Sequence, residues 1–345
     1  MSAYCSNSDL PAVAARLRAA KHLTIVSHAK PDGDAAGSVL ALARALRSSG
    51  KRVDAFFSGV VDPNILALAQ PGEVLLAPQT MPSAQSDLVV IVDTGAWSQL
   101  EPLQEYLRSM VGRIVGLDHH ARGDAIADQR VVDCSMASAT QLVVQLIDLL
   151  GVPLVVAGSP CKYSIAEALF VGLATDTGWF RFASADGRVF ALASRLLECG
   201  VDKIALYQLL EENGRPVRLA AMARALSSLS YFLEGRIALM TVSFDDCQNS
   251  GAKSEDVGGL VNVPLTIGSI KMSVVLTEAE AGVTKASFRS KNNSEGVAEF
   301  DVNSFAARFG GGGHVLAAGA KFNMPLAEAR AKLEHEFESL GAVTR

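Results

Sequence analysis

Residues 23–38 have the sequence LTIVSHAKPDGDAAGS, and they indicate how the first half of the chain is built. Residues 23–27 form a short apolar run of the kind found in a strand that is buried on both faces of a sheet. Residues 35–48 then place Val39, Leu42 and Leu46 at helical spacing. The stretch therefore predicts a strand that leads directly into a helix.

The same alternation of strand and helix continues along the chain. Apolar runs predict strands at residues 53–57, 87–92 and 113–117, and helical spacing predicts helices at residues 139–150, 164–174 and 185–199. Strands that alternate with helices are typical of an open parallel sheet with helices on both faces. Residues 201–229 are expected to be mostly helical, with a break at residues 213–216.

The C-terminal part shows a different pattern of short β-like segments. Strands are predicted at residues 237–244, 271–277 and 285–289, and helices around Asn303 and at residues 326–340. This pattern indicates a smaller α/β domain with a mixed sheet. A chain of 345 residues is long enough for two domains that each bury a core. We therefore expect a first domain at residues 1–205, a helical linker at residues 206–230 and a second domain at residues 231–345.

The composition and net charge of the chain indicate which binding partners and which cellular compartment to expect. The net charge of −5 disfavours binding to long nucleic acids, which needs a basic surface, but leaves short substrates possible. The first residues lack the pattern of a secretory signal, and no apolar stretch predicts a membrane span. Five cysteines without a Cys-x-x-Cys pair suit a reducing compartment. The sequence thus predicts a cytoplasmic protein with no membrane partner, and a homodimer is a reasonable expectation for a soluble enzyme.

Side chains that commonly bind metal ions follow three of the predicted strands. They are His28, Asp32 and Asp34 after the first strand, Asp93 after the strand at residues 87–92, and Asp118, His119 and His120 after the strand at residues 113–117. Because parallel strands end at one edge of a sheet, we expect these side chains to converge there. Imidazoles with carboxylates suit Mn²⁺ or a similar divalent cation. Two such ions about 3.5–4 Å apart would activate a water molecule for attack on a phosphoryl group.

Each of these residues also has a purely structural interpretation. Asp34 can cap the following helix, and Asp32 can shape the turn before it. A histidine at a single strand end is more often structural, so recurrence at three strand ends is what favours a metal site. Asp176, which follows the helix at residues 164–174, is either a further ligand or a turn residue, with equal support for both.

The second domain contains one further candidate site. Four consecutive glycines, Gly310 to Gly313, precede His314, and Arg289 lies upstream at a predicted strand end. Such a run can expose successive backbone N–H groups to a phosphate or sugar, or it can be a plain flexible loop. The adjoining histidine and arginine favour ligand binding.

Other chemistries have little support in the sequence. The chain has no phosphate loop of the Gly-x-x-x-x-Gly-Lys type, no Gly-x-Gly-x-x-Gly after its first strand and no Gly-x-Ser-x-Gly nucleophile elbow. Three aromatic side chains are candidates for stacking on a base, although core packing is their commoner fate. They are Trp179, Phe180 and Phe182.

Taken together, the motifs resemble those of the DHH phosphoesterase superfamily over almost the whole chain. The four motifs are His28-x-x-x-Asp32-x-Asp34, Asp93-Thr94-Gly95, Asp118-His119-His120 and Thr175-Asp176-Thr177-Gly178. Gly310 to His314 is similar to the glycine-rich signature of the DHH-associated C-terminal domain. The resemblance implies that residues 1–205 form the catalytic metal-binding domain and residues 231–345 the substrate-binding domain.

The resemblance also implies roles for single residues. It implies one Mn²⁺ on His28, Asp32 and Asp93, and a second on Asp34, Asp93, His119 and Asp176, with Asp93 as the bridge. His120 would contact the scissile phosphate, and Asp118 would orient a histidine. The remaining substrate contacts would come from Arg289, Gly311, Gly312, Gly313 and His314. The residues implied in catalysis are Asp93, Asp118, His119 and His120.

The compact two-domain layout is similar to that of the bifunctional oligoribonuclease and 3′-phosphoadenosine-5′-phosphate phosphatase group. That likeness implies exonuclease-like hydrolysis of short single-stranded RNA to mononucleotides, with the nucleotide phosphatase activity as a possible second one and no action on long duplexes. Two alternatives stay open. One is a phosphodiesterase acting on linear or cyclic dinucleotides such as pApA, and the other is a nucleotide-binding regulatory protein without turnover.

Overall fold

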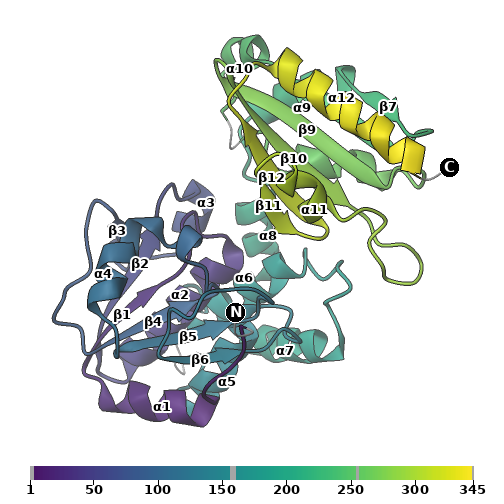
Figure 1. Ribbon diagram of the computed structural model, residues 1–345. Helices are drawn as coiled ribbons and strands as arrows, with labels where there is room; N and C mark the ends of the chain where they lie inside the picture. Colours follow the sequence, from purple (N-terminus) through teal and green to yellow (C-terminus); the bar gives the residue numbers. More distant parts are fainter. Residues whose placement is uncertain (1–3, 156–160, 254–255, 344–345) are drawn as a thin grey trace. The chain divides into compact units, whose positions relative to one another are not determined.

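The computed structural model describes residues 4–155, 161–253 and 256–343, and the chain divides into two compact units (Figure 1). Unit 1 spans Met1–Asn213 and unit 2 spans Gly214–Arg345. Helices α8 (Lys203–Glu211) and α9 (Val217–Ser227) lie on either side of this boundary in the chain. Among the described residues, no helix combines the length and the apolarity that crossing a bilayer requires.

Unit 1 is built on a six-stranded sheet in which every neighbouring pair is parallel. In spatial order the strands are β3 (Leu75–Ala77), β2 (Arg52–Ser58), β1 (His22–Val26), β4 (Leu88–Val92), β5 (Ile114–Asp118) and β6 (Gln129–Val132). The four central strands were predicted from their apolar runs. The two edge strands, β3 and β6, were not predicted, because they are short and only partly buried.

Helices cover both faces of this sheet, as predicted. Alternate residues of β4 show why its sequence is apolar throughout: Val90 and Val92 pack on one side, and Val89 and Ile91 on the other. The first side is covered by α1 (Leu10–Ala19), α2 (Gly33–Ser48), α5 (Ala139–Leu150) and α6 (Ile165–Asp176), with α7 (Gly187–Glu198) and α8 in the same core. The second side is covered by α4 (Gln104–Ser109) and the turns before it. A short helix, α3 (Pro63–Leu66), follows β2.

Unit 2 is built on a second six-stranded sheet, which is mixed, as predicted. Its spatial order is β11 (Gly312–His314), β12 (Ala317–Phe322), β10 (Val283–Ser290), β9 (Met272–Glu280), β8 (Ile237–Val242) and β7 (Ser230–Phe232). Only β8 and β9 run parallel, and the other neighbours are antiparallel. One face packs against α11 (Val302–Ala307) and α12 (Leu326–Val343). Helices α9 and α10 (Phe244–Ser250) pack over β8 and β9 on the other.

Two predicted elements of unit 2 differ from the structure. The strand predicted to reach Phe244 ends at Val242, because Ser243 and Asp246 form a capping box that starts α10. Residues 312–314, interpreted as part of a loop, form the strand β11. Gly313 is essential there, since its φ is +150° and a methyl group on it would overlap the carbonyl oxygen of Ala317 on β12.

Candidate metal centre

The candidate ligands of unit 1 lie where the direction of the chain across the sheet reverses. After β1 the chain continues to β2 on one side, whereas β4, the other neighbour of β1, leads to β5 on the opposite side. Ligands of open parallel sheets bind outside the carboxyl ends of the strands at such a point. The loops after β1, β4 and β5 carry the three strand-end motifs, and these motifs therefore share one crevice.

The two aspartates after β1 have different structural roles from those first considered. Asp32 is the N-cap of α2, and its Oδ1 accepts hydrogen bonds from the N–H groups of Asp34 and Ala35, at 3.1 and 3.0 Å. Asp34 does not cap this helix. Its carboxylate accepts the N–H groups of Ala139 and Thr140, at 2.5 and 3.0 Å, and thus binds the N-terminus of α5. Asp34 is consequently buried and held by two helices.

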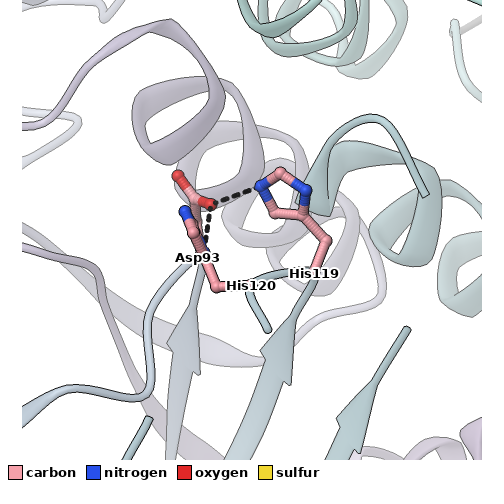
Figure 2. Close-up of side chains that lie close together, drawn as sticks. All are labelled: Asp93, His119 and His120. Atoms are coloured by element: carbon pink, nitrogen blue, oxygen red, sulfur yellow. Dashed lines mark ion pairs between the residues drawn. The ribbon is translucent and has the colours of Figure 1, made fainter. Parts of the chain in front are cut away.

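Asp93 lies at the centre of the crevice in a strained backbone conformation. It follows β4 directly, has φ of +60° and is 2 % exposed. Its Oδ1 accepts no hydrogen bond from the described residues. Figure 2 shows Asp93 pointing towards His119 and His120, and its Oδ1 lies 3.3 Å from Nε2 of His119 and 3.8 Å from Nδ1 of His120. A buried carboxylate oxygen that accepts no hydrogen bond is suited to bind a cation.

The predicted ligands come together in three overlapping groups within unit 1. In each group the possible ligand atoms lie within 4.8 Å of one another. The groups are His28, Asp32 and Asp93; Asp34, His119 and Asp176; and Asp93, His119 and His120. All six residues predicted as metal ligands are therefore in the crevice. Asp176 is the last residue of α6 and contributes Oδ2 at 3.4 Å from Nε2 of His119.

The spacing of the ligand atoms agrees with shared cations. Nε2 of His28 lies 3.5 Å from Oδ2 of Asp93 and 3.7 Å from Oδ1 of Asp32. Two ligands that bind one divalent cation at about 2.1 Å in an octahedron are about 3 Å apart. The pairs in the crevice are slightly wider than this, and they contain only oxygen and nitrogen donors. The residues present thus fit hard or borderline divalent cations, which prefer oxygen and nitrogen ligands.

The pKa values of the crevice residues are shifted because four carboxylates lie close together, those of Asp32, Asp34, Asp93 and Asp176. Burial raises the pKa of Asp34 well above its ordinary value, and the charges of Asp93 and Asp176 add to this shift. Burial also raises the pKa of Asp176 to about 7. For His119, burial lowers the pKa, but the surrounding carboxylates more than offset it and raise the pKa to about 10. The same balance raises the pKa of His28 to about 11.

Asp118 lies behind the histidines and is bound on both carboxylate oxygens. Its Oδ1 accepts Nδ1–H of His120 at 2.7 Å and the N–H of His119 at 2.8 Å. Its Oδ2 accepts the hydroxyl of Tyr4 at 2.8 Å. Burial by itself raises the pKa of Asp118, but the hydrogen bonds from His120 and Tyr4 hold it below its usual range. Tyr4 was not predicted, since no pattern around it in the sequence indicates a partner 114 residues away.

The candidate substrate residues of unit 2 lie on one face of its sheet. Arg289 on β10 and His314 on β11 both pair with Ala317 on β12. Directly paired residues of an antiparallel sheet point to the same face, so the two basic side chains flank the small Ala317. Their neighbours Phe288 and Ala318 point the other way and are buried in the core under α11 and α12. The sheet thus brings Arg289 and His314 together across one strand.

The glycine run differs from the expected loop with free N–H groups. The N–H of Gly310 donates to Ala307, and that of Gly311 donates to Ala306, each to a carbonyl oxygen. The N–H of Gly313 donates to the side-chain oxygen of Asn303 at 2.9 Å. The interpretation as a row of free donors is therefore wrong. The run is nevertheless accessible, because residues 312–314 are all exposed.

Two of the three aromatic candidates for base stacking, Trp179 and Phe180, pack against other aromatic rings of unit 1. The Trp179 ring contacts Tyr207 edge-on, and the Phe180 ring contacts those of Phe170 and Phe190. Trp179 and Phe180 line an apolar pocket of about 600 Å³ together with residues of α7 and α8. Phe182 is 56 % exposed.

Comparison with known proteins agrees with these observations. The model of the DHH family, N-terminal domain, matches residues 22–173. The bifunctional oligoribonuclease and PAP phosphatase NrnA of Thermus thermophilus is 33 % identical over 296 residues, which cover 86 % of this chain and 82 % of that protein. The crystal structure of an exopolyphosphatase-related protein from Bacteroides fragilis has a TM-score of 0.86 and 26 % identity, with 97 % of this chain and 96 % of that chain covered. A cyclic-di-AMP phosphodiesterase, GdpP of Geobacillus thermodenitrificans, is 24 % identical over 87 % of this chain and 44 % of its own length.

Proposed function

This chain belongs to the DHH family of phosphoesterases, and we propose that it hydrolyses short oligoribonucleotides to mononucleotides. We also propose that it removes a phosphate from 3′-phosphoadenosine-5′-phosphate (PAP). The observation that carries this proposal is the convergence of three donor groups on Asp93 and His119 at the switch point of the parallel sheet. The relative from Thermus thermophilus supports the choice of substrate, because its similarity to this chain extends over both units.

The donor groups divide naturally between two divalent cations, with Mn²⁺ as the proposed ion. His28, Asp32 and Asp93 would hold one. The other would be held by Asp34, Asp93, His119 and Asp176. When bound, such ions lower the pKa of a water molecule and stabilise charge on the phosphoryl oxygens. The left-handed backbone of Asp93 supports its role as the shared ligand, as does its Oδ1, which accepts no hydrogen bond from the described residues.

His120 and Asp118 supply the proposed contact to the scissile phosphate. Burial opposes protonation of His120, but the neighbouring Asp118 and Asp93 raise its pKa above the ordinary value. In the protonated ring both nitrogens are donors. Nδ1–H donates to Asp118, and Nε2–H is the donor that we assign to a phosphoryl oxygen of the substrate. This donor would stabilise negative charge as it develops on the phosphate during attack.

The proposed substrate residues of unit 2 are Arg289, the glycines Gly311, Gly312 and Gly313, and His314. A guanidinium can bind two oxygens of a phosphate at once, and an exposed histidine adds a second donor on the same face. The exposed glycines carry no side chain that would keep a nucleotide from the backbone. A site made of one arginine, one histidine and a short run of glycines suits a substrate of a few nucleotides rather than a long duplex.

A substrate panel tests the proposal. The purified chain with Mn²⁺ should convert pApA and a five-residue RNA to mononucleotides and PAP to AMP, while a twenty-residue RNA and pyrophosphate react much more slowly. Asp93→Ala should abolish these reactions. Asp54→Asn is a matched control, because Asp54 pairs with His22 at 2.7 Å within unit 1 but belongs to none of the three donor groups. Equal rates on the long and short RNAs would contradict the preference for short substrates.

Two alternatives remain with their own tests. The match to a cyclic-di-AMP phosphodiesterase supports dinucleotides as an alternative target, and this alternative predicts a higher kcat/KM on cyclic-di-AMP or pApA than on the five-residue RNA. A regulatory protein that only binds nucleotides would bind pApA without converting any substrate of the panel, even before mutation.

Three further expectations belong to the same proposal. The five cysteines of the described chain are all free thiols, which supports a reducing compartment such as the cytoplasm. The net charge of −5 supports the exclusion of long duplex nucleic acid. A homodimer is also proposed, on the general prior for soluble enzymes, and sedimentation equilibrium of the purified chain tests it.

A further inference from the structure

Tyr4 lies in a slot beside the candidate metal centre, although it is far from that centre in the sequence. Its hydroxyl donates to Oδ2 of Asp118 at 2.8 Å. The slot is formed by two loops that carry glycine at the points of contact. A methyl group on Gly95 would overlap the Tyr4 hydroxyl, and one on Gly123 would lie 2.7 Å from Cζ of the ring. The ring therefore occupies space that only glycine leaves open.

The backbone around Tyr4 is fixed independently of this hydrogen bond. The N–H of Asn7 donates to the carbonyl of Arg130 at 3.1 Å, and the N–H of Arg130 donates to Oδ1 of Asn7 at 2.7 Å. Ser6 makes the same kind of two-way contact with Val132, at 3.0 and 2.8 Å. These contacts attach residues 6 and 7 to β6, so Tyr4 reaches the slot from a firmly held segment.

Asp118 connects Tyr4 to His120. The carboxylate is 1 % exposed, and its Oδ1 is occupied by His120 and by the backbone of the same loop. Oδ2 has Tyr4 as its hydrogen-bond donor. A buried carboxylate that loses the donor on one oxygen can rotate or recruit water, and its hold on the other partner then loosens. The phenol of Tyr4 is therefore linked to the imidazole of His120 through the Asp118 carboxylate.

We propose that Tyr4 is a positioning residue for the reaction, which fixes the Asp118 carboxylate and through it the orientation of the His120 ring. The inference rests on the proposed function, since it assumes that His120 donates to the scissile phosphate. It also goes beyond the motifs, because Tyr4 lies outside all of them. Loss of a partner that orients a site histidine typically lowers activity about 10–100-fold.

Tyr4→Phe is the main test, because it removes the hydroxyl and keeps the ring in its slot. We expect kcat on pApA to fall about ten-fold while KM stays within two-fold of wild type, since His120 would lose alignment in the transition state and not substrate binding. Tyr106→Phe is the matched control. Tyr106 is a buried tyrosine of unit 1, whereas Tyr4 is half-buried, and the Tyr106 hydroxyl donates to the carbonyl of Ser83 instead of to Asp118. This control should change neither constant.

Gly123→Ala is an independent route to the same effect. The added methyl group displaces the Tyr4 ring, while Asp118 and His120 keep their own side chains. We therefore expect kcat to fall as in Tyr4→Phe. If both substitutions act through one hydrogen bond, the double variant should be no slower than the slower single variant. Additive losses would show that Gly123 and Tyr4 act separately and would overturn the proposed path.

A spectroscopic readout separates this inference from the proposed function. In protein labelled with ¹⁵N-histidine, Tyr4→Phe should shift the Nδ1–H signal of His120. It should leave unchanged the Nε2–H signal of His22, whose Nε2 pairs with Asp54. If wild type hydrolyses none of the substrates, the proposed function fails, and this signal alone decides whether Tyr4 orients His120. An unchanged His120 signal, or a kcat within two-fold of wild type in an active enzyme, overturns the inference.

Discussion

Oδ1 of Asp93 lies 3.3 Å from Nε2 of His119, although Asp93 follows β4 and His119 follows β5. The two strands are neighbours, with Val92 opposite Leu117, so Asp93 and His119 follow their strands at the same edge of the sheet. Each residue of the pair belongs to two of the three donor groups, and one group contains both.

The first prediction concerns cation binding at Asp93. A ligand that binds only the folded protein stabilises it by about 2.7 kcal/mol at one hundred times its Kd. Mn²⁺ should therefore raise the Tm of the wild-type chain by several degrees. Asp93→Asn should lose most of this rise, because the amide carries no charge for either ion. Differential scanning calorimetry with and without Mn²⁺ measures the difference, and Asp54→Asn should keep the full shift. A full shift in Asp93→Asn would rule out Asp93 as a ligand.

The second prediction is that cation affinity rises with pH. The pKa of Asp176 is raised to about 7, and those of His119 and His28 to about 10 and 11. The protonated forms of these groups cannot bind a cation, so binding must displace their protons. Each displaced proton increases the apparent affinity about ten-fold per pH unit below the pKa of its group. Titration calorimetry in two buffers of different ionisation enthalpy should detect proton release at pH 7.5. Equal affinity at pH 6 and pH 9 would contradict the assignment.

The third prediction concerns the close approach of α6 to Asp34. A methyl group on Gly172 would lie 2.7 Å from Oδ1 of Asp34 and would overlap the side chain of Thr140. Gly172→Ala should therefore destabilise unit 1 by about 1–3 kcal/mol and weaken cation binding, because the carboxylate must move. Gly187→Ala is the matched control, since a methyl group there meets no atom within 4 Å. Urea denaturation measures both variants, and an equal effect of the two would count against the packing argument.

The fourth prediction separates substrate binding from turnover in unit 2. Arg289→Ala should raise KM for pApA and PAP about ten-fold and change kcat little, because the lost contact is made in the ground state and the transition state alike. Arg308→Ala removes a second arginine of the same unit, one that pairs with Glu336 on the surface at 2.9 Å. It should leave both constants unchanged. A fall in kcat with constant KM for Arg289→Ala would instead place the guanidinium at the reacting phosphate.

Much of unit 1 could be predicted because its signals are local in the chain. The run that became β4 is apolar at every position, and those of β1 and β5 are mostly apolar. His28, Asp93 and Asp118 lie at the ends of these strands or within two residues of them. Parallel strands bring such ends together whatever the details of packing. This is why five of the six ligands could be assigned to one crevice from the strand ends alone, whereas Asp176, at the end of α6, was assigned through the family resemblance.

The features that could not be predicted depend on contacts between distant segments. Asp34 was considered as a cap of its own helix, but its partners are the first N–H groups of α5, more than 100 residues later. β11 consists of glycine and histidine, which have no strand propensity, and it forms because the glycines let β12 approach. Tyr4 belongs to the same class, because nothing next to it in the chain indicates that a slot between Gly95 and Gly123 exists.

The attachment of residues 6 and 7 to β6 has a consequence for association between molecules. β6 is the last strand of its sheet, and the outer edge of such a strand offers unpaired N–H and C=O groups to any other chain. Here the N–H groups of Arg130 and Val132 already donate to Asn7 and Ser6 side chains, and the carbonyls of both residues are occupied as well. Side chains and backbone N–H groups of this segment thus cover the β6 edge of the sheet, and the segment that brings Tyr4 to the centre also protects this edge from pairing with another chain.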